Sequence, residues 1–224
     1  MRAAIIALVS AASSCGMVRP AFALGSATTV FESVVLAYHA ESKECHKPRR
    51  VLREATQRTL ASAISEACDL VWPCQPERAD WMFALKLTET NVGPSSTLTG
   101  AREKTHGPFC ITVFEAREAA RVLRVPLPRT ADDVAKTLRD DYAVSALLAA
   151  WTLNVYEHQM RDRILGMLAY KYGPRGLARA LEAAGTRPPT DLIPWQRFAQ
   201  KLSEIKCVRA RVEMGAPATC GCLP

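Results

Sequence analysis

Glu89 is the side chain of this sequence best placed to do chemistry. It ends an apolar run over residues 81–89 with the sequence WMFALKLTE. At helical spacing Met82, Leu85 and Glu89 share one face, so the carboxyl group continues a buried stripe. Burial favours the protonated form of a carboxyl group, and a neutral carboxyl can protonate the leaving oxygen of a glycosidic bond. The simpler alternative is a charged residue that ends a helix in solvent.

Two later segments carry residues that suit a groove beside such an acid. A polar loop over residues 91–106, rich in Gly, Ser and Thr, leads to the sequence GPFCI at residues 107–111, and the sequence AYKYG follows at residues 169–173. Helical spacing there predicts a stripe toward the core and places Tyr170 on the opposite side. The stripe consists of Leu165, Leu168, Ala169 and Tyr172, and the neighbours of Tyr170 are Arg163, Gly166 and Met167.

The order of these elements, over roughly residues 76–185, resembles the catalytic domain of the soluble lytic transglycosylases, which cleave peptidoglycan glycan strands. In that family a Ser follows the catalytic Glu, and a Gly-Ala pair lies in the next loop. A Gly-Leu-Met-Gln or Gly-Pro-Phe-Gln motif then opens a helix, and an Ala-Tyr-Asn-x-Gly motif comes last. Here Thr90 follows Glu89 and residues 100–101 are Gly-Ala, whereas Cys110 replaces the Gln and Lys171 replaces the Asn.

The resemblance implies an all-α, or nearly all-α, lysozyme-like domain in which Glu89 carries the chemistry alone. Glu89 would protonate the oxygen of the β-1,4 bond between N-acetylmuramic acid and N-acetylglucosamine. It would then act as base while the muramoyl C6 hydroxyl attacks C1, which leaves a 1,6-anhydro end. The substrate-binding residues that the resemblance implies are Thr90, Gly107, Pro108, Phe109 and Tyr170. No cofactor or metal is expected, because the four histidines lack the spacing of metal ligands.

Three alternatives stay open. Hydrolysis by a lysozyme route would follow if a second acid, Glu103, Asp132 or Asp133, faced Glu89 across the groove. The departures at Cys110 and Lys171 favour instead a protein that keeps the fold and binds peptidoglycan, or assists envelope assembly, without catalysis. An exported partner of a secretion or conjugation machine is a related possibility.

The amino terminus predicts export. Residues 1–23 start Met-Arg, continue through a short apolar stretch and end Ala-Phe-Ala, the pattern of a signal peptide cleaved after Ala23. We therefore expect a periplasmic or secreted protein with no stable membrane span, because no later stretch is apolar over about 18 residues. Cleavage would remove Arg2 and Arg19, so the net charge of +7 would fall to about +5. A modest positive charge suits an anionic cell wall; nucleic acid is not expected as a partner, because the basic residues are scattered.

Cysteine usage supports an oxidising compartment. Of eight cysteines, seven follow the predicted cleavage point, so we expect most to be paired and one to be left free or intermolecular. For the Cys220-Gly221-Cys222 segment disulfides are a better interpretation than a metal site.

Helical spacing of apolar residues runs through nearly every segment. It predicts helices over residues 48–70, from Thr112, from Thr130, over 142–158 with a buried seam of Leu147, Ala150, Trp151 and Val155, and over 192–206. Residues 208–224 lack a clear period. We expect an N-terminal helical extension at 24–75, a lysozyme-like domain at 76–206 and a cysteine-containing tail at 207–224.

Overall fold

The computed structural model of the protein describes residues 22–45, 53–90, 105–216 and 222, and this part of the chain is mostly helical. The all-α class is therefore confirmed. The helices are α1 (Phe22–Cys45), α2 (Glu54–Val71), α3 (Arg78–Thr90), α4 (Val113–Leu123), α5 (Ala131–Asp140), α6 (Tyr142–Met160), α7 (Arg163–Tyr172), α8 (Pro174–Ala184) and α9 (Ile193–Glu213), with a 3-10 turn at Pro189–Asp191. Strands β1 (Thr105–His106) and β2 (Ile111–Thr112) pair antiparallel.

Side-chain caps explain where several helices begin. Thr112 caps α4 by accepting from the Glu115 main-chain N–H, while the Glu115 carboxylate accepts from the Thr112 N–H, a complete capping box. Thr130 caps α5 by accepting from the Asp133 main-chain N–H, and the sequence predicted this helix start. Asp141 and Asp162 cap α6 and α7, so the polar residues between these helices satisfy N–H groups that would otherwise lack partners.

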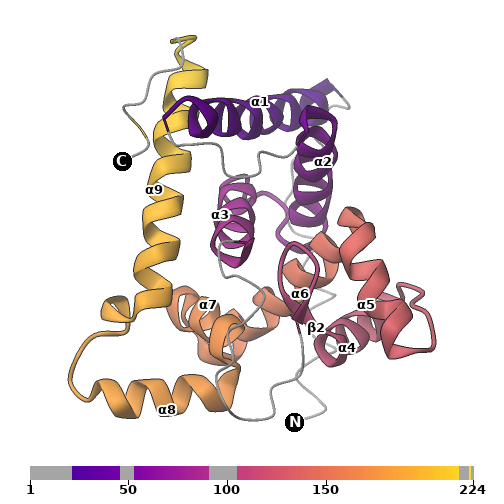
Figure 1. Ribbon diagram of the computed structural model, residues 1–224, viewed down its shortest axis with the longest axis vertical. Coiled ribbons are helices and arrows are strands. Elements are labelled where there is room, and N and C mark those ends of the chain that lie inside the picture. The colour runs from indigo at the N-terminus through magenta and orange to yellow at the C-terminus, as the bar shows by residue number, and fades with distance from the viewer. Residues whose placement is uncertain (1–21, 46–52, 91–104, 217–221, 223–224) are drawn as a thin grey trace.

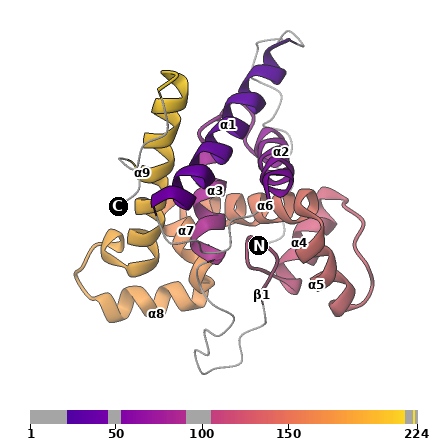
Figure 2. The same ribbon diagram turned by 45° about the horizontal axis from the view of Figure 1, so that its top comes forward.

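Helix α6 lies at the centre and contacts α2, α4, α5 and α7 (Figures 1 and 2). Because these neighbours surround it, α6 is buried on more than one side: Leu148 and Leu153 are fully buried, although they lie outside the predicted seam. Within that seam Ala150 and Trp151 are buried, whereas Leu147 and Val155 are only half-buried. The predicted seam therefore covers only part of the buried surface of α6.

Helices α1 and α2 share one apolar core with the later helices. Phe31 and Tyr38 of α1 contact Phe83 of α3 at ring-centroid distances of 6.2 and 5.4 Å. Helix α2 packs on α6, and α1 packs on α9. The core therefore runs continuously across residue 76, where the sequence suggested a boundary between an extension and a domain.

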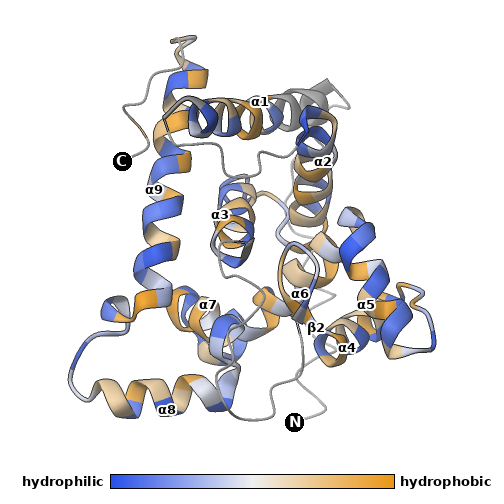
Figure 3. Ribbon diagram, viewed as in Figure 1, coloured by the Kyte–Doolittle hydropathy of each residue, from blue (hydrophilic) through white to orange (hydrophobic). Residues whose placement is uncertain are grey.

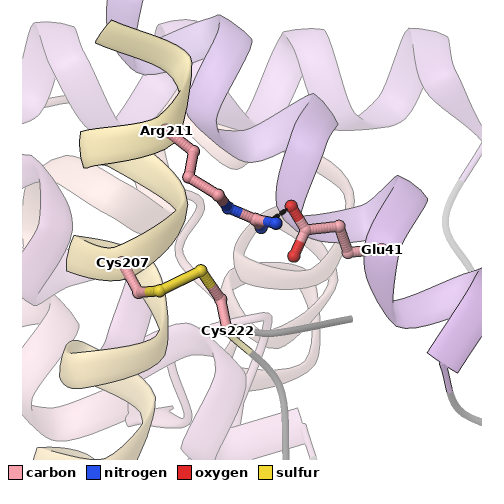
Figure 4. The surroundings of a disulfide bond; sticks show 4 residues. All are labelled: Glu41, Cys207, Arg211 and Cys222. Carbon is pink, nitrogen blue, oxygen red and sulfur yellow. Dashed lines mark hydrogen bonds and ion pairs between the residues drawn. A yellow bond between two sulfur atoms is a disulfide. The ribbon is translucent and has the colours of Figure 1, made fainter. Parts of the chain in front are cut away.

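Helix α9 extends seven residues beyond the predicted end at residue 206, to Glu213. Its buried apolar residues Phe198, Leu202, Ile205 and Val208 keep the helical spacing, and polar residues lie between them along the axis (Figure 3). Ion pairs add to this apolar attachment: Arg209 binds both oxygens of Asp80 at 2.9 and 2.6 Å, and Arg211 pairs with Glu41 of α1. Figure 4 shows this second pair beside the disulfide Cys207–Cys222.

The cysteines differ in part from the expectation. Cys74 is also disulfide-bonded. Cys68 and Cys110 both carry free thiols, so the expectation that one cysteine is left unpaired is wrong. Cys68 is buried in the apolar core with its thiol free. Of the predicted leader at residues 1–23, residues 1–21 lie outside the described residues, and Phe22 and Ala23 form the start of α1. No helix in the described part of the chain is long and apolar enough to cross a membrane.

Candidate active site

Glu89 points inward at the carboxyl end of α3. The residue is 6% exposed, and Met82 and Leu85 on the same face are fully buried. The predicted stripe is confirmed, and the alternative of a helix-end carboxylate in solvent is wrong. A buried carboxyl group needs a partner, because an unpaired charge in the interior is costly.

Lys171 supplies that partner. Its ammonium group contacts Glu89 Oε1 from the last turn of α7, 82 residues further along the chain. The Lys171 side chain is 16% exposed, so the ammonium lies at the edge of the interior rather than in bulk water. The residue at which the sequence departs from the transglycosylase motif is therefore the one that contacts the candidate acid.

Tyr170 connects α7 to the loop before α4. Its hydroxyl donates a hydrogen bond to the main-chain carbonyl of Phe109 at 2.8 Å. Burial raises the pKa of Tyr170 well above its ordinary value, and the charges of Glu89 and Glu115 add to the effect, so the phenol stays neutral. Tyr170 can orient this loop but cannot supply a phenolate base.

The predicted geometry of α7 is only partly correct. Tyr170 does face the loop, but Gly166 and Met167, expected on its side of the helix, are buried together with Leu168 and Ala169. Leu165 and Tyr172 of the predicted stripe are only half-buried. The reason is that α7 lies between α6 and α9; a Cβ atom at Gly166 would come within 2.6 Å of Glu157 Cα.

The loop from Gly107 to Cys110 is held tightly. Gly107 has φ +77°, and a Cβ there would lie 2.1 Å from the carbonyl oxygen of Leu138, so glycine is required. Phe109 is fully buried in the core, which leaves only its main chain available to the site. Gly107 and Pro108 are half-exposed.

Cys110 stands where the family motif has Gln. Its thiol is free and lies 4.0 Å from the main-chain carbonyl of Glu89. Burial raises the pKa of the Cys110 thiol to about 12, and the nearby Glu89 charge contributes. A protonated thiol is a poor nucleophile. Cys110 is therefore not part of a disulfide, and thiolate chemistry at this residue is disfavoured.

Glu115 is a second carboxylate whose charge acts on Tyr170, and the sequence did not identify it as a candidate. Its Oε1 accepts from the Tyr156 hydroxyl at 2.7 Å, and its Oε2 accepts from the Thr112 hydroxyl at 2.8 Å. The capping-box spacing of Thr112 and Glu115 was the available signal. Asp132 and Asp133 are exposed on the first turn of α5, and Glu103, like the polar loop over residues 91–104, lies outside the described residues.

Three segments far apart in sequence therefore meet at one corner: the end of α3, the loop over residues 107–110 and the end of α7. Thr90 follows Glu89 in α3, but its side chain lies outside the described part. Among the described residues no cluster of three or more His, Cys, Asp and Glu side chains could hold a metal. We call this the Glu89 corner, formed by Glu89, Phe109, Cys110, Tyr170 and Lys171.

A cleft of about 910 Å³ lies elsewhere, between α1 and α2 on one side and α5 and the start of α6 on the other. Its charged lining residues include Glu32, Arg58 and Lys136, and Arg58 is already paired with Glu32 and Glu54. None of the residues of the Glu89 corner lines it.

Comparison of the chain with protein-family models, with curated proteins and with solved structures finds no match.

Proposed function

We propose that this protein is a peptidoglycan lytic transglycosylase with a lysozyme-like fold, in which Glu89 acts first as acid and then as base. The meeting of the three motif-bearing segments supports the proposal. Three contacts join these segments. Glu89 contacts Lys171, the Cys110 thiol contacts the Glu89 carbonyl, and the Tyr170 hydroxyl donates to the Phe109 carbonyl. Motifs that resembled the family by chance would have no physical reason to assemble around the candidate acid.

In the proposed reaction the neutral Glu89 carboxyl donates its proton to the glycosidic oxygen as the bond to the muramoyl C1 breaks. The departing sugar leaves with a hydroxyl group. The Glu89 carboxylate then removes the proton of the C6 hydroxyl while that oxygen bonds to C1, which restores the acid. The Lys171 ammonium would stabilise the carboxylate between the two steps, since opposite charges attract strongly in a partly buried site.

A second candidate function is peptidoglycan binding without turnover. The observation that favours it is the Glu89–Lys171 ion pair, because a carboxylate neutralised by an ammonium group has no proton to donate. A third outcome, hydrolysis, would require a second carboxylate to activate water. Glu115 is the candidate for that role, although Thr112 and Tyr156 already bind both of its oxygens.

The test is digestion of purified sacculi followed by mass spectrometry of the released fragments. We expect 1,6-anhydro ends from the wild type and, for Glu89→Gln, a loss of at least about a thousandfold in rate, the scale of a lost general acid and base. Glu118→Gln is the matched control, because Glu118 is an exposed glutamate that pairs with Arg121 on the surface of α4. Reducing ends would instead indicate a hydrolase, and binding of sacculi without release would leave only the non-catalytic function.

Export of the protein to the cell envelope belongs to the same proposal, since its substrate lies outside the cytoplasm. Partnership with an envelope-spanning secretion or conjugation machine would fit a wall-cleaving enzyme. The described part of the chain carries no feature that selects such a partner over free action on the wall.

A further inference from the structure

The Glu89–Lys171 ion pair sets a condition on any chemistry at Glu89. If Glu89 takes up the proton that an acid must donate, the Lys171 ammonium loses its countercharge. Lys171 is only 16% exposed, so water solvates it incompletely. Leaving one member of a partly buried ion pair charged and alone is much less favourable than keeping the pair.

No other described group at this corner is positioned to replace Glu89 as the partner of Lys171. Cys110 keeps its proton, since burial raises the pKa of its thiol to about 12. Tyr170 likewise stays a neutral phenol and donates its proton to the Phe109 carbonyl. Glu115 is held through both oxygens by Thr112 and Tyr156. The missing countercharge must therefore come from a bound molecule or from movement of Lys171 into water.

The proposed substrate has such an anion beside the reacting bond in one of its chemical forms. The lactyl group of N-acetylmuramic acid ends in an amide when a stem peptide is attached, and this amide is neutral. After removal of the peptide the lactyl group ends in a carboxylate. A carboxylate is the same kind of charge that Lys171 already binds in Glu89.

We propose that Lys171 is a specificity residue that exchanges Glu89 for the lactyl carboxylate of a peptide-free glycan strand, which leaves Glu89 free to carry its proton. This inference rests on the proposed function and names its substrate class: strands that an amidase has already stripped of peptide. The exchange conserves charge, because one carboxylate leaves the ammonium as another arrives. A peptide-bearing strand offers no charge for the exchange and is cleaved more slowly.

Cleavage rates on two substrates test the exchange. Glycan strands of matched length, with stem peptides intact or removed by an amidase, are digested by the wild type, Lys171→Asn, Lys171→Arg and the surface control Lys206→Asn. We expect the wild type and Lys206→Asn to prefer peptide-free strands by at least about tenfold in kcat/KM, the scale of one charge-assisted contact. Lys171→Asn loses this preference, and Lys171→Arg keeps only part of it, because a guanidinium binds a carboxylate through several fixed donors and exchanges it less readily. Equal rates of the wild type on both substrates would overturn the inference while leaving the transglycosylase proposal intact.

Binding separates the two proposals if no cleavage occurs. Calorimetry compares a muramic acid oligosaccharide that bears a free lactyl carboxylate with its lactyl amide. Glu89→Gln leaves Lys171 without its carboxylate partner, so we expect this variant to bind the carboxylate form at least about tenfold more tightly than the amide. The double variant Glu89→Gln/Lys171→Asn should bind both equally. Selective binding without turnover would end the catalytic proposal and support the role of Lys171; binding of both forms with equal affinity by Glu89→Gln would overturn that role.

Discussion

Two buried ion pairs in this molecule are built in different ways. Arg78 binds both oxygens of Glu157 at 2.7 Å, and the side chains are 4% and 6% exposed. The guanidinium also lies 4.7 Å from the ring of Trp72 and 5.6 Å from that of Trp81. At the Glu89 corner a lysine contacts one carboxylate oxygen, and its side chain is several times more exposed.

The difference separates a pair that holds helices together from one that can change partners. A guanidinium is planar and presents several fixed donors, so a second carboxylate cannot replace Glu157 without breaking several contacts at once. An ammonium group on a flexible stem makes one contact and can turn to another anion. The first arrangement suits architecture at the junction of α3 and α6, and the second suits exchange with a ligand.

Removal of Arg78 should have the largest effect on stability. Arg78→Met leaves Glu157 charged and buried without its partner, so the free energy of unfolding should fall by about 3–5 kcal/mol. Urea denaturation followed by circular dichroism measures this change. Arg121→Met is the control, since Arg121 pairs with Glu118 on the exposed face of α4 and should cost less than about 1 kcal/mol. If both variants were equally stable, Arg78–Glu157 would not be the architectural pair of the comparison.

His39 shows a third way to bury an ionisable group, because within the described part of the chain no countercharge pairs with it. It is 8% exposed and packs against the ring of Phe83 at 5.8 Å. Burial lowers the pKa of His39 from 6.5 to about 4, and the charge of Lys86 contributes. Between these values the unfolded chain binds a proton that the folded chain does not, so stability falls as the pH falls from about 6.5 to about 4, in total by about 3 kcal/mol.

The measurement is the free energy of unfolding of His39→Gln and of the wild type between pH 7 and pH 4. We expect the variant to lose less stability than the wild type across this range. His158→Gln is the control, because His158 is exposed on α6. Parallel curves for all three proteins would show that His39 is not the group whose burial opposes protonation.

Lys171→Asn should change stability far less than Arg78→Met. Glu89 is left without its ammonium partner, but the edge position of Lys171 admits water to the site, so we expect a loss below about 2 kcal/mol. Urea denaturation under the conditions used for Arg78→Met gives a direct comparison. A loss as large as that of Arg78→Met would make the Glu89 corner an architectural pair as well, and the exchange of partners would then be too costly.

The sequence was informative where the signal was local. Thr130 and Thr112 were recognised as helix starts because an N-cap lies within three residues of the groups that it satisfies. The inward direction of Glu89 followed from its apolar neighbours on the same helix face. These features depend on helix geometry alone.

What the sequence could not reveal depends on contacts between distant segments. Lys171 was noted as a departure from a motif, but its contact with Glu89 bridges 82 residues and follows from how α7 packs on α6. Glu115 was overlooked because its hydrogen-bond partner Tyr156 lies on another helix, 41 residues further along the chain. The far end of α9 was missed for the same reason, since ion pairs with Asp80 and Glu41, on helices far away in the sequence, stabilise it beside the buried Val208.

Thr112→Ala should have the smallest effect on stability, and it tests whether Glu115 is structural or takes part in the chemistry. The change removes the hydroxyl that caps α4 and binds Glu115, so stability should fall by about 1 kcal/mol. If Glu115 serves only to hold α4, cleavage of sacculi by Thr112→Ala should match that of the wild type. If Glu115 instead activates water, releasing one of its oxygens should change the ratio of reducing to 1,6-anhydro ends. Mass spectrometry of the products then distinguishes a corner with one working carboxylate from a corner with two.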